Sequence, residues 1–176
     1  MIKIKNKLLL FWTIIIIVLL LSLIAIYIVV SSKKNSVKEY KKDYYSFKYD
    51  TTWKIKDNKN STVLTHKSTN GKIVITYKVL DTYLIDVDLK NIISDIIYEV
   101  EKQNKDYTLI NKNSNEDGSY NLLYEKEKEE CLVHIYKQDN IILFVYYNNS
   151  SKYFDITMDS FEEVLNSIKV YSGEKM

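Results

Sequence analysis

The sequence predicts an α+β domain, with an antiparallel sheet and two packed helices, preceded by one N-terminal transmembrane helix. Three patterns indicate this class. An uncharged apolar run near the start is long enough to span a bilayer. Several later segments alternate apolar and polar residues, which is typical of strands, and two others carry apolar stripes at helical spacing. Strands and helices in this order favour a sheet with its helices packed against it.

The apolar run extends from Leu8 to Val30 and contains no charged residue. A helix of this length spans roughly 34 Å, slightly more than the ~30 Å hydrocarbon core of a bilayer. Trp12 and Tyr27 lie near its two ends, where amphipathic rings favour the headgroup level. A cleaved signal peptide has a shorter apolar core of ~7–15 residues and a small-residue cleavage site. We therefore expect an uncleaved signal anchor whose partner is the lipid bilayer.

The flanks of this run are basic. Residues 1–7 form a short basic tail, and residues 31–43 form a lysine-rich stretch that we expect to be a flexible tether. A strict count of flanking lysines does not favour a cytoplasmic N-terminus, but a short basic start usually stays in the cytoplasm and long domains translocate regardless of charge. We expect a single-pass protein of the cell membrane with an extracytoplasmic domain over residues 44–172, followed by a disordered C-terminus at 173–176.

The first strands of the domain form a predicted hairpin. Apolar residues occupy every second position from Ile73 to Val79, and Asn70-Gly71 stands directly before them. Val63 and Leu64 lie on the other side of this dipeptide. The pattern predicts two antiparallel strands joined by a tight primed turn at Asn70-Gly71.

The second half repeats this logic after Asp117-Gly118. Alternation runs from Tyr120 to Tyr124 and again from Cys131 to Ile135, which predicts two half-buried strands. The segment from Ile141 to Tyr147 is almost continuously apolar. It is predicted to be a central strand buried on both faces.

Two segments have helical periodicity. The first has its apolar stripe between Leu89 and Val100, with Asp86 or Asp88 available as an N-cap. The second is predicted over 154–168, where Asp159 or Ser160 can begin the regular part. Its stripe consists of Phe161, Val164, Leu165 and Ile168.

The domain opening, Tyr45-Ser46-Phe47-Lys48-Tyr49-Asp50-Thr51-Thr52-Trp53-Lys54-Ile55, resembles that of the PsbP-like superfamily. Members begin with an aromatic-containing strand, a Tyr-Pro turn and a tryptophan that starts the next strand. The end, Asn166-Ser167-Ile168-Lys169-Val170, is similar to the family's finish after an amphipathic helix. The resemblance covers about residues 44–171, and Asp50 stands where the family has its turn proline.

This resemblance implies a layered sheet-and-helix fold and, for many bacterial relatives, a membrane-attached extracytoplasmic domain. It also implies an accessory or binding role, because characterised relatives are not enzymes. No catalytic residues, cofactor-binding residues or cofactor follow from it.

Charge and composition narrow the function classes. Removing Lys3, Lys5 and Lys7 from the 25 basic residues leaves 22 lysines against 23 acidic residues. A nucleic-acid binder would carry a basic excess with arginine, and this chain has no arginine, so we expect no nucleic-acid partner. The lysine-rich, proline-free composition is typical of AT-rich coding and favours a bacterium of low GC content.

His66, His134 and Cys131 are the soft metal ligands of the chain. Cys131 and His134 are three apart on one predicted strand, so their side chains point to opposite faces and cannot share a metal. Cys131 shares a face with Val133 and Ile135, which favours a buried inert thiol over a nucleophile.

Three further groups of residues are candidates for calcium, phosphate or partner binding. Asp81, Asp86 and Asp88 lack the spacing and central glycine of a calcium loop, and glycine occurs only at 71, 118 and 173, which excludes a phosphate-binding loop. The sixteen tyrosines cluster at the domain opening and near the last strand, where they fit either a sheet or an interface. Ordinary sheet residues are the preferred interpretation. The clusters are Tyr44, Tyr45, Tyr49, Tyr146, Tyr147 and Tyr153.

The sequence therefore predicts a membrane-anchored, non-enzymatic binding or assembly accessory domain of a bacterial envelope, with an envelope protein as partner and no metal. Two alternatives stay open. One is an enzyme with a site built from scattered Asp, Glu or Tyr residues. The other is a self-assembling envelope or channel component.

Overall fold

The computed structural model describes Ser22, residues 36–81 and residues 84–171. The predicted basic tail, the C-terminal 173–176, the first part of the tether and, apart from Ser22, the predicted spanning helix lie outside these residues. None of the helices in the described ranges has the length and apolar character needed to cross a bilayer. The elements below belong to the unit that begins at Val37.

A seven-stranded antiparallel sheet forms the body of this unit, in the order β3-β4-β5-β9-β8-β7-β6. β9 is its central strand. The face that carries Val145 is buried, but Phe144 and Tyr146 on the other face are half-buried, so the predicted burial on both faces is confirmed only in part. The strands are β3 (Trp53–Asn58), β4 (Ser61–His66), β5 (Lys72–Val79), β6 (Thr108–Ser114), β7 (Tyr120–Lys126), β8 (Glu129–Gln138) and β9 (Ile141–Ser150).

The β4–β5 hairpin is confirmed, but its predicted turn type is wrong. A longer loop leads from His66 to Gly71, whose backbones are hydrogen-bonded at 2.8 Å. Only Asn70 has a positive φ, of 60°, whereas a type I′ turn needs positive φ at both central residues. Gly71 is required for a different reason, because a Cβ there would lie 2.5 Å from Nδ2 of Asn149.

The β6–β7 hairpin follows the sequence more closely. Gly118 has a φ of 80°, and its N–H donates to the carbonyl of Asn115 at 3.0 Å. This is a type I turn followed by a left-handed residue, a common three-residue hairpin loop. The predicted alternation is confirmed, because Leu122 and Tyr124 of β7 are buried on one face.

A second, three-stranded sheet has the order β1-β2-β10 and was not predicted. It consists of β1 (Lys38–Lys42), β2 (Tyr45–Tyr49) and β10 (Lys169–Val170). The tether predicted over 31–43 is therefore wrong for its second half. Tyr40 packs on Phe47 with ring centroids 5.2 Å apart, and the ammonium of Lys42 reaches Asp57 on β3. The lysines of β1 thus lie along a paired strand and not along a solvated linker.

α2 (Leu89–Gln103) confirms the first predicted helix. Asp88 occupies the N-cap position, yet its side chain makes no capping hydrogen bond and instead forms an ion pair with Lys90 at 3.1 Å. Ile93, Ile97 and Val100 are buried against the sheet, as their spacing predicts.

The second predicted helix is interrupted. The segment divides into α3 (Ser151–Phe154), a 3₁₀ turn η2 (Asp155–Thr157) and α4 (Met158–Asn166). Thr157 explains the break, because its hydroxyl is buried and hydrogen-bonded to Asn149 and to the carbonyl of Tyr153. Ile168 lies beyond the helix, since the chain turns there into β10.

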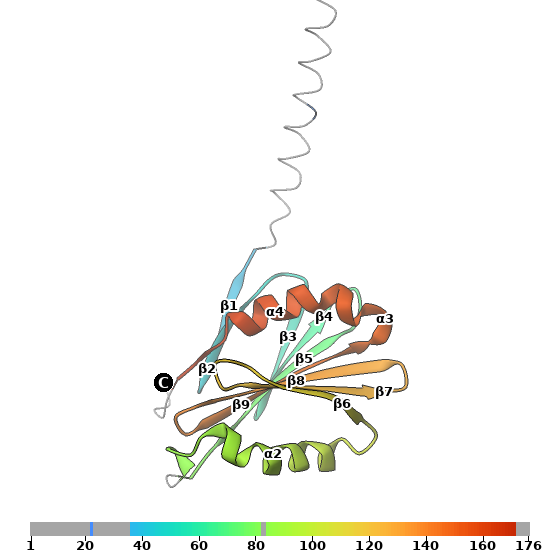
Figure 1. Cartoon of the computed structure of the whole chain (residues 1–176). Coiled ribbons are helices and arrows are strands. Elements are labelled where there is room, and N and C mark those ends of the chain that lie inside the picture. The colour runs from blue at the N-terminus through green and yellow to red at the C-terminus, as the bar shows by residue number, and fades with distance from the viewer. Residues whose placement is uncertain (1–21, 23–35, 82–83, 172–176) are drawn as a thin grey trace, which may run out of the picture. The chain divides into compact units, whose positions relative to one another are not determined.

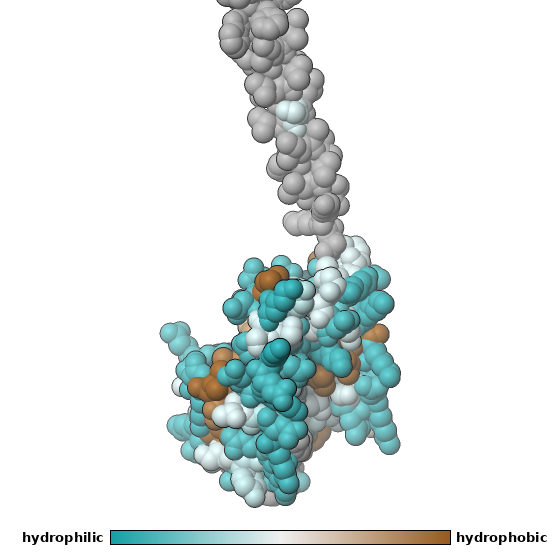
Figure 2. Space-filling view, turned by 90° about the vertical axis from the view of Figure 1, so that its right-hand side faces the viewer, coloured by the Kyte–Doolittle hydropathy of each residue, from teal (hydrophilic) through white to brown (hydrophobic). Residues whose placement is uncertain are grey.

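The helices lie on opposite faces of the large sheet, with α2 on one face and α3 and α4 on the other (Figure 1). One core lies under α4 and the small sheet, and a second lies under α2. An α+β fold with antiparallel pairing and two principal helices is thus confirmed. Figure 2 shows a mostly hydrophilic face, with hydrophobic residues in small separate patches.

Candidate functional site

A cleft of about 530 Å³, lined by both polar and apolar residues, lies between the large sheet and the α4–β10 connection. We call it the His134 cleft. His134, Tyr136 and Gln138 reach it from alternate positions of β8, and Asn166 and Lys169 come from the end of α4 and from β10. The period of two along the strand places the three β8 side chains on this face.

A series of side-chain hydrogen bonds fixes the orientation of the His134 ring. Asp117 accepts from the Ser119 hydroxyl at 2.6 Å, and that hydroxyl accepts from the Asn115 amide at 2.8 Å. Oδ1 of Asn115 accepts from the Asn121 side-chain amide at 3.4 Å, and Oδ1 of Asn121 lies 2.7 Å from Nδ1 of His134. Because an amide oxygen only accepts, this orientation of Asn121 makes Nδ1 the donor, and Nε2 of the neutral ring presents a lone pair.

Burial keeps this imidazole neutral. It lowers the pKa of His134, while the more distant carboxylate of Asp117 acts weakly in the opposite direction. The Ser119 hydroxyl and backbone N–H lower the pKa of Asp117, so that carboxyl stays ionised. The cleft therefore presents a neutral acceptor on β8 whose orientation is fixed by Asn121 of β7 and by residues of the β6–β7 turn.

Cys131 and His134 point to opposite faces of β8, as their spacing predicts. Cys131 lies on the α2 face, where burial and the Glu129 carboxylate raise its thiol pKa to about 12. A thiol with that pKa stays protonated at neutral pH and is a poor nucleophile.

His66 has a structural role in β4. Its ring packs edge-on against Trp53 with centroids 5.0 Å apart, and its Nδ1 lies 3.0 Å from the Thr69 hydroxyl. Burial lowers its pKa. Trp53 in turn donates from Nε1 to Ser160 of α4 at 2.9 Å, so this aromatic pair joins β3, β4 and α4.

The remaining sequence candidates are separate from this cleft. Asp86 and Asp88 lie in the loop before α2, while Asp81 follows β5 and is exposed. Across the described ranges, no group of three or more His, Cys, Asp or Glu residues could hold a metal ion. Tyr45 and Tyr147 are fully buried core residues whose hydroxyls bond to Thr62 at 2.7 Å and to the carbonyl of Phe154 at 2.9 Å.

A second concavity, which the sequence did not reveal, lies between α2 and the sheet. We call it the α2 groove; it has a volume of about 480 Å³. Ile92 and Ile96 of α2 are only half-buried and face Phe144 and Tyr146 of β9 across it. The apolar stripe of α2 contained a signal for this groove. Ile92 and Ile96 make the stripe wider than the line of fully buried residues requires.

Comparison with solved structures identifies the fold. The solution structure of cyanobacterial PsbP (CyanoP) from Synechocystis sp. PCC 6803 superposes with a TM-score of 0.61 at 18% identity, covering 78% of this chain and 94% of that one. The chain has the PsbP-like fold. No protein-family model matches the sequence, and no curated protein does.

Two other structures are more distantly similar to this PsbP-like fold. A protein from Bacteroides thetaiotaomicron has a TM-score of 0.48 at 15% identity, covering 79% of this chain and 50% of that one. LpqN of Mycobacterium tuberculosis, described as involved in cell envelope biogenesis, has a TM-score of 0.49 at 8% identity, covering 79% and 94%.

The PsbP-like fold accounts for the resemblance at the domain opening. β2 contains the aromatic strand, and Trp53 begins β3 as in the family. At the turn, Oδ1 of Asp50 accepts from the Thr52 backbone N–H at 2.8 Å and also from the Thr52 hydroxyl. An aspartate turn therefore stands where the family has a proline.

Proposed function

We propose that this chain is a non-enzymatic binding or assembly accessory domain of a bacterial envelope, anchored in the membrane through Leu8 to Val30. A PsbP-like fold fits a non-catalytic accessory domain. The length and apolar character of the run support the anchor, and its short basic start supports the extracytoplasmic side.

The His134 cleft carries the binding role. It offers a partner one oriented imidazole acceptor, the Asp117 carboxylate, amide groups at Gln138 and Asn166, and the ammonium of Lys169. The residues that line it include no serine, threonine or cysteine to act as a nucleophile beside the imidazole. Such a set of groups can recognise polar atoms of a protein surface without reacting with them.

Site-specific photo-crosslinking in living membranes tests this role. A photoreactive residue at Gln138, on the cleft, is expected to give a discrete cross-linked protein band. The matched control is the exposed Lys54 on β3, away from the cleft, which is expected to give none. Recovery of the uncrosslinked chain alone from both positions would contradict the proposal.

Thiol labelling tests the anchor and its orientation. In a Cys131→Ser background, the exposed Ser36 is changed to cysteine and intact cells are treated with a membrane-impermeant reagent. Labelling without permeabilisation is expected for an extracytoplasmic domain. Labelling only after permeabilisation would reverse the orientation, and full-length protein in the aqueous fraction would remove the anchor.

A further inference from the structure

A partly open pocket of about 220 Å³ lies under the C-terminal end of α2. We call it the α2 chamber. Its walls are mostly apolar and include Val74 of β5, Val100 of α2 and Val133 of β8. Val100 and Tyr146 also line the α2 groove, so the two spaces adjoin.

One polar atom in this chamber is unsatisfied. Tyr124 is 3% exposed, and its hydroxyl makes no hydrogen bond; among the described residues, no other buried side-chain oxygen or nitrogen lacks a partner. A buried hydroxyl without a partner is costly, so native proteins rarely leave one unpaired. The neighbouring hydroxyl of Tyr107 is different, because it donates to Glu129 at 3.0 Å and accepts from Asn148 at 2.8 Å.

The surroundings define what can pair with this hydroxyl. Burial and the Glu101 carboxylate raise the pKa of Tyr124, so the group remains a protonated donor that needs an acceptor. No lysine lines the chamber, and Glu101 and Glu129 lie near it, which disfavours an anion. A neutral molecule that carries a hydrogen-bond acceptor fits these surroundings. A cavity of about 150 Å³ holds a benzene ring, so this chamber has room for a substituted ring.

We propose that the α2 chamber binds a neutral, ring-sized molecule whose carbonyl oxygen accepts a hydrogen bond from the Tyr124 hydroxyl. The apolar walls hold the ring, and the α2 groove accommodates any substituent that extends from it. This site lies on the face of the sheet opposite the His134 cleft. The proposal is therefore independent of the function proposed above.

The single cysteine of the chain provides the test, because Cys131 lines the chamber. Full-length protein in lipid nanodiscs is treated at pH 9 with methyl methanethiosulfonate, and the modified fraction is followed by intact mass. Acetophenone and ethylbenzene are the probes, since they differ by a carbonyl in place of a methylene. Both are expected to slow modification. The readout is the half-protecting concentration of ethylbenzene divided by that of acetophenone. This ratio is expected to fall about fivefold in Tyr124→Phe, because acetophenone alone loses a hydrogen bond, and a fivefold change is typical of one neutral hydrogen bond.

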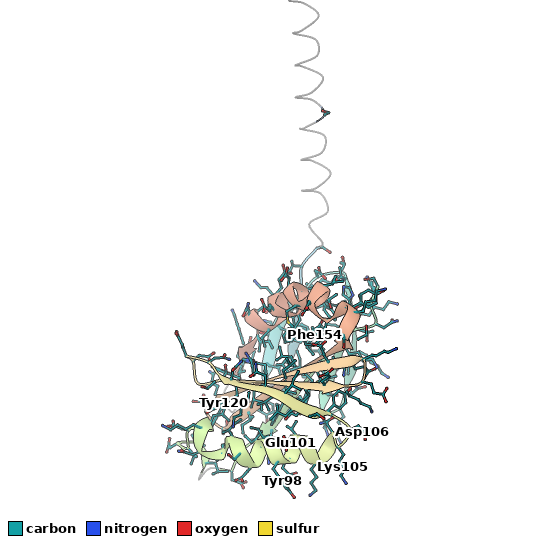
Figure 3. All side chains as sticks on the ribbon, turned by 45° about the vertical axis from the view of Figure 1, so that its right-hand side comes forward. Tyr98, Glu101, Lys105, Asp106, Tyr120 and Phe154 are labelled. Atoms are coloured by element: carbon teal, nitrogen blue, oxygen red, sulfur yellow. The ribbon has the colours of Figure 1, made fainter. Side chains whose placement is uncertain are left out.

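Matched variants exclude indirect effects. Tyr98→Phe changes an exposed tyrosine on the outer face of α2 and is expected to leave the ratio unchanged (Figure 3). Tyr124→Phe is expected to keep or raise the thermal midpoint, because it removes an unpaired hydroxyl. A lowered midpoint together with an unchanged ratio would mean that water satisfies the hydroxyl, and the proposal would fail.

A blocking variant keeps the test decisive if Tyr124→Phe does not fold. Val74→Phe fills the chamber from the β5 wall and is expected to abolish protection of Cys131 by both probes. Protection that persists in Val74→Phe, or no protection by acetophenone in the unmodified protein, overturns the proposal.

Discussion

Replacing Gly71 by alanine is expected to destabilise the domain through one contact. The new Cβ would lie 2.5 Å from Nδ2 and 2.8 Å from Cγ of Asn149, a side chain that is only 3% exposed. Asn149 cannot move without cost, because its amide donates to Thr157 at 2.9 Å and its carbonyl accepts from the N–H of Ser150 at 2.9 Å. Gly71 has no positive φ, so backbone strain is absent from this substitution.

The magnitude follows from three terms. Overpacking a filled site costs about 1–3 kcal/mol, and weakening a buried hydrogen bond adds about 1 kcal/mol. Alanine recovers ~0.5 kcal/mol by restricting the unfolded chain. We expect Gly71→Ala to lower the free energy of unfolding by about 2–3 kcal/mol, measured by urea denaturation of the full-length protein with circular dichroism.

A double-mutant cycle identifies the contact responsible. In an Asn149→Ala background the space is open, so Gly71→Ala is expected to be close to neutral, with a coupling energy of about 2 kcal/mol. Gly118→Ala is the matched control: its φ is 80° and nothing lies within 4 Å of the new Cβ. It should cost ~1–2 kcal/mol through the backbone alone, equally in both backgrounds. An equal cost of Gly71→Ala in both backgrounds would refute the steric argument.

Three further predictions concern the cleft and the domain opening. Because burial lowers the folded-state pKa of His134, the folded state binds fewer protons, so the stability that this group contributes is present above the unfolded pKa of ~6.5 and declines as the pH falls below it. His134→Gln should reduce the pH dependence of urea midpoints between pH 5 and 8 and leave the part that comes from His66, whose pKa burial also lowers; an unchanged slope would contradict this. Trp53→Phe should lower the free energy of unfolding by about 2–3 kcal/mol and Ser160→Ala by ~1 kcal/mol, because the first removes packing as well as the 2.9 Å hydrogen bond. Equal denaturation midpoints for the two variants would count against this. Asp50→Ala should cost ~1 kcal/mol and Asp50→Asn much less, since asparagine can still accept from the Thr52 N–H; thermal unfolding distinguishes the two.

The sequence could predict elements whose side chains report burial directly. β9 and α2 were found because Ile141 to Tyr147 and the stripe from Leu89 to Val100 encode packing against close neighbours. β1 was missed because its pairing with β2 is made by the backbone, while its lysines resemble a solvated linker. The turn after His66 differs from its prediction for a similar reason. Glycine is required at 71 by the close approach of Asn149, a residue far away in the chain.

The candidate sites depend on register, which periodicity does not specify. His134 was noted from its residue type, but its orientation depends on the pairing of Asn121 with His134 across β7 and β8. The unpaired hydroxyl of Tyr124 likewise arises only once α2 covers the sheet. Strand alternation predicts which face a residue occupies, whereas cross-strand partners require the assembled fold.

The middle strand of the small sheet has one neighbour from each end of the domain. β2 pairs with β1 immediately before it and with β10 at the end of the described chain, where Ser46 and Tyr171, 125 residues apart, are joined by a 2.6 Å hydrogen bond. Synthesis adds ~5–20 residues per second, so β2 waits several seconds for its second partner. The small sheet therefore stays incomplete until β10 has left the ribosome, and chaperones or proteases can act on the domain during that interval.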